Sequence, residues 1–502
     1  MEENVNEETS KKLEGENGSR VNGSEDKKKN VIIVIVDAFR TKNVSLYGYD
    51  KVTDKNLSKM GSEGLVFKDF YSSSNATAPS LTSIFTGKYP SNHGIVHQFP
   101  YTAEEEFTKL EENKFWLPSF LKGKGYETIA VDWIGLFFKE GFDYYEEKDD
   151  SVSMMKKFMN LPSVKKFLLG LPNWAYAFGK KMVKTRASAN FSPAKETMSL
   201  GISKIKEIDE QGSKKPFFLF MHFWDTHFPF PTTPFNGSGK DDINEFLGKI
   251  ENNSQREYFK KRVTDIGLKS VDDMIDKYDA SITMVDKQIG RLVKYLKRNG
   301  KWDDTVLIVL GDHGTSLVDH KVYFSSSSLF DDTLHVPYVM HLPGYLGKGV
   351  GGFAQNVDIT PTLLDYLGFS GNSDIDEGIK NEMDGKSLLR LINGGKIRDR
   401  VLFFDGLAGD IKGVRTFDRK LIVADRNQCN LCKSSHHESV EEYDLINDPR
   451  EENNVFNGSS ELMKFLDGGV DESEVSSKVV DYVKNSDKEV GLSASSTYSS
   501  FY

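Results

Sequence analysis

Carboxylate and imidazole side chains follow three apolar runs of this 502-residue chain, each at the point where the run ends. Asp37 follows "VIIVIV", Asp225 and His227 follow "PFFLFMHFW", and Asp312 and His313 follow "TVLIVLG". Such donors suit a divalent cation, either a hard ion such as Mg²⁺ or Ca²⁺ or a borderline one such as Mn²⁺ or Zn²⁺. An aspartate after a strand is often only a helix cap, but three such segments together favour one shared site. The pattern predicts a metal site that would hold an anionic ester.

A threonine opens a predicted helix in the stretch "SNATAPSLTSIFTGKYPSNHG". Thr77 is a good helix cap, Pro79 is tolerated in the first turn, and Gly87 can end the helix. The simplest interpretation is a capping threonine. A helix start also binds phosphate or sulfate, however, and a cation bound to the hydroxyl would lower its pKa and make it a nucleophile. Thr77 is therefore a candidate metal ligand and nucleophile.

The elements that must position these residues are short buried strands. Five continuous apolar runs, over residues 31–36, 127–131, 216–224, 305–310 and 336–342, are typical of strands buried on both faces of a parallel sheet. Residues 271–300 predict a long amphipathic helix that ends at Gly300. We expect an α/β fold with a mostly parallel central sheet flanked by helices and a smaller C-terminal α+β subdomain. The carboxyl ends of parallel strands share one edge, which would bring the three polar segments together.

Changes in composition divide the chain into five parts. We expect a solvated, disordered tail over residues 1–29, and an α/β catalytic domain over residues 30–375 that includes a basic insertion at 151–195. The loops "SGNSDIDEG" and "INGGKIRDR" mark the transition to a C-terminal subdomain over 376–490, and residues 491–502 form a frayed tail.

Charge and cysteine content exclude several classes of function. The net charge of -10 argues against nucleic acid as the main partner, since binding to phosphate backbones needs a concentrated basic face. Two cysteines cannot form a disulfide framework, which indicates a reducing compartment. The N-terminal residues lack the apolar stretch of a secretory signal, and the run at 31–36 is too short to span a membrane. We expect a cytoplasmic protein.

The basic insertion carries no acidic residue, and its lysines flank the apolar stretch "FLLGLPNWAYAF". This composition fits a lid, an oligomer contact or a peripheral helix that docks on anionic lipid. A solvated insertion that covers its own apolar face is favoured over the membrane interpretation. If the segment does contact a membrane, a lipid-linked ester becomes a natural substrate.

The stretch "CNLCKSSHH" contains enough donors for one tetrahedral zinc ion. Its ligands would be Cys429, Cys432, His436 and His437. The spacing is irregular for a zinc knuckle and no second pair of cysteines exists, so a structural zinc here is the less favoured interpretation.

Thr77 and the residues after it, "TAPSLTSIFTGKYPSNHG", resemble the signature of the sulfatases in the alkaline phosphatase superfamily, in which Cys or Ser stands at the first position. The blocks "NVIIVIVDAFR", "PFFLFMHFWDTHFPF", "TVLIVLGDHG", "LHVPYVMHLPG", "VDITPTLLDYLG" and "YDLINDPREENNV" resemble further family motifs in the same order, from about residue 30 to 456. The resemblance implies metal ligation by Asp37, Asp312 and His313, a nucleophile at position 77, and contact of His227 with the ester.

Departures from the family pattern bear on the chemistry. Sulfatases oxidise the signature Cys or Ser to formylglycine, which threonine cannot form, so no formylglycine is expected and Thr77 would act through its own oxygen. Ala38 replaces the second Asp of the family's Asp-Asp pair, and Leu81 replaces the signature Arg. The Gly-Lys-Trp-His block of the family reads Val131 to Ile134. These changes argue against a sulfate-specific pocket of the usual kind, and a threonine that acts through its own oxygen resembles the threonine-dependent phosphatases, phosphodiesterases and phosphoglycerol-type transferases of the superfamily.

The remaining histidines and Asp225 are candidates for a second metal site, for acid catalysis or for structural roles. Asp225, His227 and His335 could bind a second metal or the substrate, and two metals could clamp the attacking and leaving oxygens. His320 is a candidate acid for the leaving oxygen, although an exposed loop histidine explains it equally well. We interpret His97, His222 and His341 as structural.

The leading hypothesis is a metal-dependent, sulfatase-like hydrolase that cleaves a sulfate or phosphate ester of a small molecule, sugar or lipid, with Thr77 as nucleophile. One alternative is a phosphodiester hydrolase, a phosphoglycerol-type transferase or a sugar-phosphate mutase. A non-catalytic homologue that retains only the metal is a further alternative.

Overall fold

The computed structural model of the protein describes residues 28–98, 102–132, 134–147, 193–230, 242–266, 268–370, 381–395, 400–407, 410–424, 429 and 432–466. Most of the expected N-terminal tail, the basic insertion up to residue 192 and the tail at 491–502 lie outside these residues.

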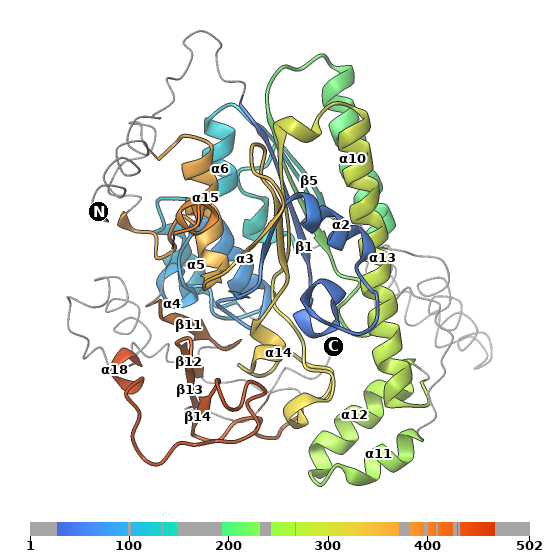
Figure 1. The fold of residues 1–502 in the computed structure, drawn as a ribbon, viewed down its shortest axis with the longest axis vertical. Helices are drawn as coiled ribbons and strands as arrows, with labels where there is room; N and C mark the ends of the chain where they lie inside the picture. The colour runs from blue at the N-terminus through green and yellow to red at the C-terminus, as the bar shows by residue number, and fades with distance from the viewer. Residues whose placement is uncertain are drawn as a thin grey trace, which may run out of the picture.

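An eight-stranded sheet lies at the centre of the molecule (Figure 1), in the order β5-β4-β6-β1-β7-β8-β2-β9. Its strands are β1 (Asn30–Val36), β2 (Leu65–Phe67), β4 (Glu127–Asp132), β5 (Tyr144–Glu147), β6 (Phe217–Phe223), β7 (Thr305–Gly311), β8 (Tyr338–His341) and β9 (Lys348–Val350). Strands β5, β4, β6, β1 and β7 are parallel, whereas β8 runs antiparallel to both β7 and β2. The predicted α/β class and the mostly parallel sheet are confirmed.

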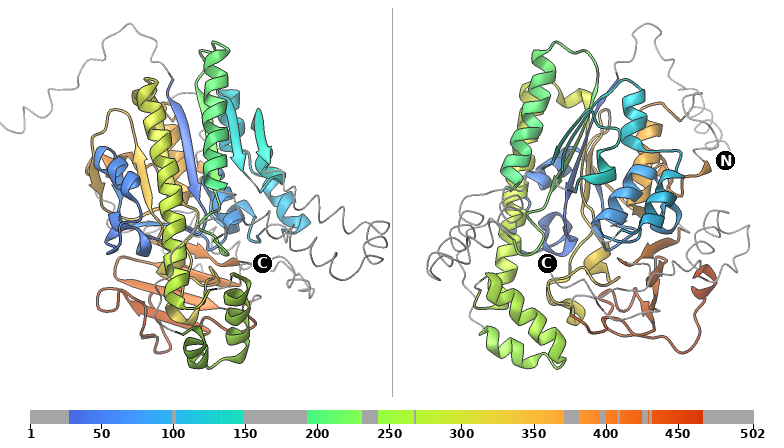
Figure 2. Two further views of the ribbon diagram at one scale, coloured as in Figure 1. Left: turned by 90° about the vertical axis from the view of Figure 1, so that its right-hand side faces the viewer. Right: turned by 180° about the vertical axis from the view of Figure 1, so that it is seen from behind.

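Helices cover both faces of this sheet, which explains why its strands are apolar without alternation. Val31, Ile33 and Ile35 belong to a core shared with α3 (Thr77–Thr86), α6 (Leu117–Gly123) and α15 (Ile359–Tyr366). Ile32, Val34 and Val36 belong to a second core shared with α2 (Lys55–Glu63), α10 (Pro193–Glu210) and α13 (Val271–Arg298). Figures 1 and 2 show α10 and α13 on one side of the sheet and α3, α6 and α15 on the other. The long helix predicted before Gly300 is α13.

A second, antiparallel sheet forms the C-terminal subdomain at one end of the molecule (Figure 2). It contains β11 (Leu402–Asp405), β12 (Ile411–Arg415), β13 (Arg419–Ala424) and β14 (Val440–Asp444) in sequential order. Met383, Leu388 and Ile392 still pack in the core under α3, although they follow the boundary expected near residue 375. Packing of the main domain therefore continues almost to β11.

Shorter elements complete the described fold: β3 (Phe70–Tyr71), β10 (Ala354–Gln355), α4 (Pro90–His93), α5 (Glu104–Glu111), α11 (Ile243–Lys249), α12 (Asn253–Ile266), α14 (Asp331–Leu334), α17 (Leu389–Ile392) and α18 (Met463–Leu466). In the part of the chain that the structure describes, no helix combines the length and apolar character needed to cross a bilayer.

Candidate active site

Three neighbouring strands carry the centre of the site at or just beyond their carboxyl ends. β1 lies between β6 and β7, so Asp37 after β1 and Asp312 after β7 meet His222 of β6. Donor atoms of these three buried residues lie within 4.8 Å of one another. The polar side chains that meet at this edge of the parallel sheet therefore include His222, which the sequence alone suggests to be structural.

The two carboxylates of this cluster are buried with little compensation. Asp37 and Asp312 are 1% and 0% exposed. Both Asp37 oxygens and Oδ2 of Asp312 have no hydrogen-bond partner among the described residues, while Asp312 Oδ1 accepts from the backbone N–H groups of Ala38 and His313. Burial, and after it the negative charge of Asp312, raise the pKa of Asp37 well above its usual range. A cation bound between these carboxyl groups would offset the cost of burying negative charge here.

His313 connects this pair to Thr77. Its Nε2 lies 3.6 Å from Asp37 Oδ1, 3.7 Å from Asp312 Oδ2 and 3.3 Å from Thr77 Oγ1. Its Nδ1 donates to the carbonyl of Gly314 at 2.7 Å, which leaves the lone pair on Nε2. The nitrogen that could ligate a metal therefore faces both carboxylates and the threonine hydroxyl.

Helix α3 presents Thr77 at its start. Ala76 is the cap residue and Thr77 the first helical residue, so the hydroxyl contacts His313 and makes no capping bond. Ser80 Oγ donates to the carbonyl of Asp312 at 2.6 Å and accepts from Nδ2 of Asn356 at 2.9 Å, which ties the first turn to the metal-ligand segment. Gly87 ends the helix in the left-handed region, at a φ of 71°.

Two departures from the sulfatase pattern are visible at this place. Ala38 has a φ of 55°, uncommon for a residue with a side chain, and its N–H lies 3.2 Å from Asp312 Oδ1. The backbone at position 38 thus supports Asp312, while no second carboxylate is present there. Leu81 is fully buried in the core between α3 and the sheet, so position 81 offers no cation to an anionic ligand.

His222 is held by a carboxylate of the next strand. Its Nδ1 lies 2.9 Å from Asp132 Oδ1, and its Nε2 lies 3.9 Å from Asp37 Oδ2. Tyr145 also hydrogen bonds to Asp132. Histidines that ligate metals are commonly oriented by such a carboxylate on their other nitrogen. The signal available in the sequence was a titratable residue near the end of an otherwise apolar strand, which must find a partner when buried.

Asp225 and His227 lie on the loop after β6. Asp225 Oδ1 accepts from the N–H of Ala194 at the start of α10, so it acts at least in part as a helix cap. His227 Nδ1 donates to the carbonyl of Phe228 at 2.7 Å. Burial, with a smaller effect of the His313 imidazole, lowers the pKa of His227 to about 3, so this ring is neutral near pH 7.

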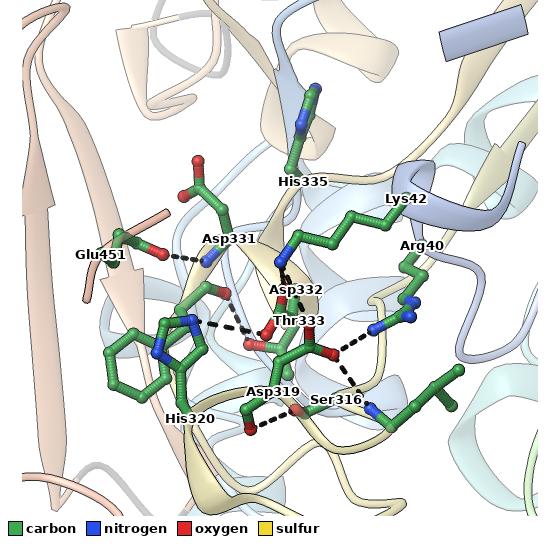
Figure 3. Close-up of polar contacts among 12 residues, drawn as sticks. Arg40, Lys42, Ser316, Asp319, His320, Asp331, Asp332, Thr333, His335 and Glu451 are labelled. Carbon is green, nitrogen blue, oxygen red and sulfur yellow. Dashed lines mark hydrogen bonds and ion pairs between the residues drawn. The ribbon is translucent and has the colours of Figure 1, made fainter. Parts of the chain in front are cut away.

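His335 and His320 make contacts elsewhere. The two ring nitrogens of His335 lie 3.2 Å from Thr41 Oγ1 and 2.7 Å from the carbonyl of Lys68, and its ring stacks on Tyr71. His320 stacks on Phe330 and directs Nε2 toward Asp332 Oδ2 at 3.6 Å (Figure 3). These contacts do not bring His335 together with Asp225 and His227, which were its candidate partners for a second metal. They also do not direct His320 toward Thr77, where an acid for the leaving oxygen would be needed.

The residues at the centre of the site fit a divalent cation. Three orphaned carboxylate oxygens and a histidine nitrogen with its lone pair available are the ligands such an ion requires. The arrangement also places a hydroxyl at the first residue of a helix, where backbone N–H groups favour an anion.

The chain is similar to known proteins over most of its length. The family model "Sulfatase" matches residues 29–369, and the model "N-sulphoglucosamine sulphohydrolase, C-terminal" matches residues 319–468. An arylsulfatase of Clostridium perfringens is 26% identical over 73% of this chain and 78% of its own length. An N-acetylglucosamine-6-O-sulfatase of Bacteroides thetaiotaomicron is 22% identical over 88% of this chain and 84% of its own length.

Solved structures share the fold. One determined in complex with its substrate D-glucosamine-2-N,6-O-disulfate has a TM-score of 0.61 and 19% identity, and covers 92% of this chain and 100% of its own. A phosphonate monoester hydrolase of Agrobacterium radiobacter has a TM-score of 0.57 and 19% identity, with coverages of 85% and 91%. The family model spans more than half of the chain. This protein therefore belongs to the sulfatase family of ester-bond hydrolases, within the alkaline phosphatase superfamily.

Proposed function

We propose that this protein hydrolyses a phosphate or sulfate ester with Thr77 as the nucleophile, in a site that depends on a divalent cation. One observation carries the proposal: the Thr77 hydroxyl and the two buried carboxylates of Asp37 and Asp312 all lie near Nε2 of His313, at 3.3 to 3.7 Å. The proposed nucleophile and the proposed metal ligands are thus close to the same atom.

Asp37, His222, Asp312 and His313 would hold the cation. When bound, such an ion lowers the pKa of a nearby hydroxyl and offsets the negative charge of the ester. In the first turn of α3 the N–H of Ala78 donates to Gln98 Oε1 at 2.8 Å, that of Ser80 donates to the carbonyl of Ala76 at 3.1 Å, and Pro79 has none, so this helix would act on the ester chiefly through its dipole. His227, whose Nδ1 donates to the carbonyl of Phe228, would contact the ester group, as the resemblance to the family implies.

Features of the site favour phosphate over sulfate. Threonine cannot supply the formylglycine on which sulfatases depend, and the buried Leu81 leaves no arginine at the signature position. A multifunctional alkaline phosphatase superfamily protein of Trinickia caryophylli is 23% identical over 74% of this chain, and the relatives therefore include proteins that are not named as sulfatases. We propose a small or sugar-linked anionic ester as substrate.

Turnover of an aryl sulfate, a phosphomonoester, a phosphodiester and a phosphonate monoester, each with Mn²⁺, Mg²⁺, Ca²⁺ or Zn²⁺, tests the proposal. We expect a phosphoester to be cleaved in a metal-dependent reaction. Thr77→Ala should lose about a thousandfold or more in kcat while it retains metal, and Thr77→Ser should recover part of the loss.

Other outcomes separate the alternatives. Wild-type turnover by Thr77→Ala would contradict the nucleophile role. Metal binding without hydrolysis of any ester would indicate a non-catalytic homologue. Transfer to an alcohol or isomerisation of a sugar phosphate, without release of phosphate, would indicate a transferase or a mutase.

A further inference from the structure

A second cluster of metal-ligand side chains lies in the C-terminal subdomain, in the connection between β13 and β14. Residues 425–439 form this connection, which is long for a hairpin. It contains Cys429 and Cys432, the two cysteines of the chain, and His436. Donor atoms of these three residues lie within 4.8 Å of one another.

The distances within the cluster fit a zinc ion. Cys432 Sγ lies 3.2 Å from His436 Nε2. Tetrahedral zinc with Zn–S bonds of about 2.3 Å and Zn–N bonds of about 2.0 Å separates sulfur and nitrogen ligands by about 3.5 Å. A small expansion of the cluster would therefore admit the ion.

The backbone closes a turn around these donors. The N–H of Lys433 donates to the carbonyl of Cys429 at 2.9 Å, and the N–H of Cys429 donates to the carbonyl of Ser434 at 2.8 Å. Lys433 has a φ of 57°, a left-handed conformation that reverses the chain directly after Cys432. The two thiols are held on the same side by bonds that do not involve sulfur.

The sequence suggests His437 as a fourth ligand, but in the structure its side chain bonds elsewhere. Its Nε2 accepts from the backbone N–H of Leu329 at 3.0 Å, and its Nδ1 pairs with Glu441. These bonds anchor the connection to the main domain, while the neighbouring His436 points to the thiols.

We propose that Cys429, Cys432 and His436 bind one Zn²⁺, with solvent in the fourth position, and that this ion holds the connection between β13 and β14 together next to His437, which anchors it to the main domain. The site is chemically distinct from that at Asp37 and Asp312, because thiolates select zinc-like ions over Mg²⁺ or Ca²⁺. The proposal does not depend on the reaction at Thr77.

Cobalt substitution in the reduced, metal-free full chain tests it, since only thiolate ligation gives an intense sulfur-to-cobalt charge-transfer band in the near ultraviolet. We expect this band to saturate at one equivalent of Co²⁺ and to disappear when Zn²⁺ is added. Cys429→Ser and Cys432→Ser should abolish it, and His436→Asn should weaken Co²⁺ binding at least about tenfold.

Two controls keep the result specific. Asp312→Asn removes a ligand of the other site and His341→Gln removes an unrelated buried histidine, so both should retain the band. Near-ultraviolet circular dichroism should show the metal-free cysteine variants to be folded like the metal-free wild type. Absence of the band in the reduced wild type, or wild-type Co²⁺ affinity in His436→Asn, would overturn the proposal.

Discussion

His222 connects the proposed metal site to the carboxylate of Asp132 on the neighbouring strand β4. Asp132 orients the imidazole through Nδ1, and the opposite nitrogen is directed toward Asp37. An oriented imidazole binds a cation without the entropy loss of fixing its ring.

We therefore expect His222→Gln and Asp132→Asn to weaken binding of the activating cation by about 10- to 100-fold, with the larger effect at His222. Titration calorimetry with Mn²⁺ measures this directly. His341→Gln is the matched control, because His341 is also a buried strand histidine but its Nε2 contacts the carbonyl of Trp302. Equal Mn²⁺ affinity in all variants would remove His222 from the site.

The sequence was informative about residues whose role depends on position along the chain. Asp37, Asp312 and His313 follow strands, so the topology of a parallel sheet alone brings them together. His222 lies inside a strand, and its role depends on the register that pairs it with Ile35 of β1. Register is set by long-range packing and is not encoded locally, which is why a local pattern missed it.

At the scale of elements, α3 must be held in register with the segment after β7 for Thr77 to reach His313. Ser80 makes that connection through its bonds to the carbonyl of Asp312 and the amide of Asn356. Because all of these groups are buried, loss of the hydroxyl leaves polar atoms without partners.

Ser80→Ala should lower the free energy of unfolding by about 1–3 kcal/mol, and it should lower kcat more than KM because Thr77 is displaced. Denaturant unfolding and steady-state kinetics measure the two effects. Thr82→Val is the control, since the Thr82 hydroxyl bonds only within its own helix, to the carbonyl of Ala78. If both variants had the same kcat, Ser80 would have no positioning role.

Helix α14 links the C-terminal sheet to the active site. Glu451 accepts from the N–H of Asp331 at the start of α14 and from Lys420 of β13, and the carbonyl of Thr333 accepts from the N–H of Gly314 next to His313. Burial, and after it the Asp331 carboxylate, raise the pKa of Glu451 to about 7 from 4.5.

A carboxyl group with a raised pKa retains its proton in the folded state at pH values where the unfolded chain has lost it. The free energy of unfolding of the wild type should therefore fall, relative to that of Glu451→Gln, as the pH rises from about 4.5 to 7. Urea unfolding of both proteins across this range gives the difference. Parallel stability curves would show that Glu451 ionises normally.

Helices and strands, like the site residues, were predictable where a local sequence pattern defines them and not where they depend on distant segments. The central strands and α13 were predictable because each is a long apolar or amphipathic pattern. The antiparallel direction of β8 and the short edge strands β2 and β9 depend on pairings between distant segments, such as Val66 with Val339. The C-terminal boundary was less predictable because Met383 and Leu388 look like loop residues until the core that receives them is known.

At the scale of the whole molecule, the uncompensated carboxylates should make stability depend on the cation. Asp37 and Asp312 are buried close together at the centre of the sheet, where their repulsion opposes folding. An ion that binds only the folded state stabilises it in proportion to the logarithm of its concentration, by about 2.7 kcal/mol at 100 times Kd.

Asp37→Asn should separate these two effects. Without metal, the variant should unfold at a higher temperature than the metal-free wild type, because a neutral amide replaces a buried anion beside Asp312. With Mn²⁺, the wild type should gain stability and the variant should gain little.

Asp319→Asn is the control, because this substitution should lower the unfolding temperature instead of raising it. Asp319 pairs with Arg40 at 2.6 Å, and loss of this ion pair should destabilise the protein with or without metal. Thermal unfolding of the three proteins with chelator and with Mn²⁺ distinguishes the cases. A metal-free Asp37→Asn less stable than the metal-free wild type would mean that these carboxylates are compensated without a cation, and the proposed metal site would lose its physical basis.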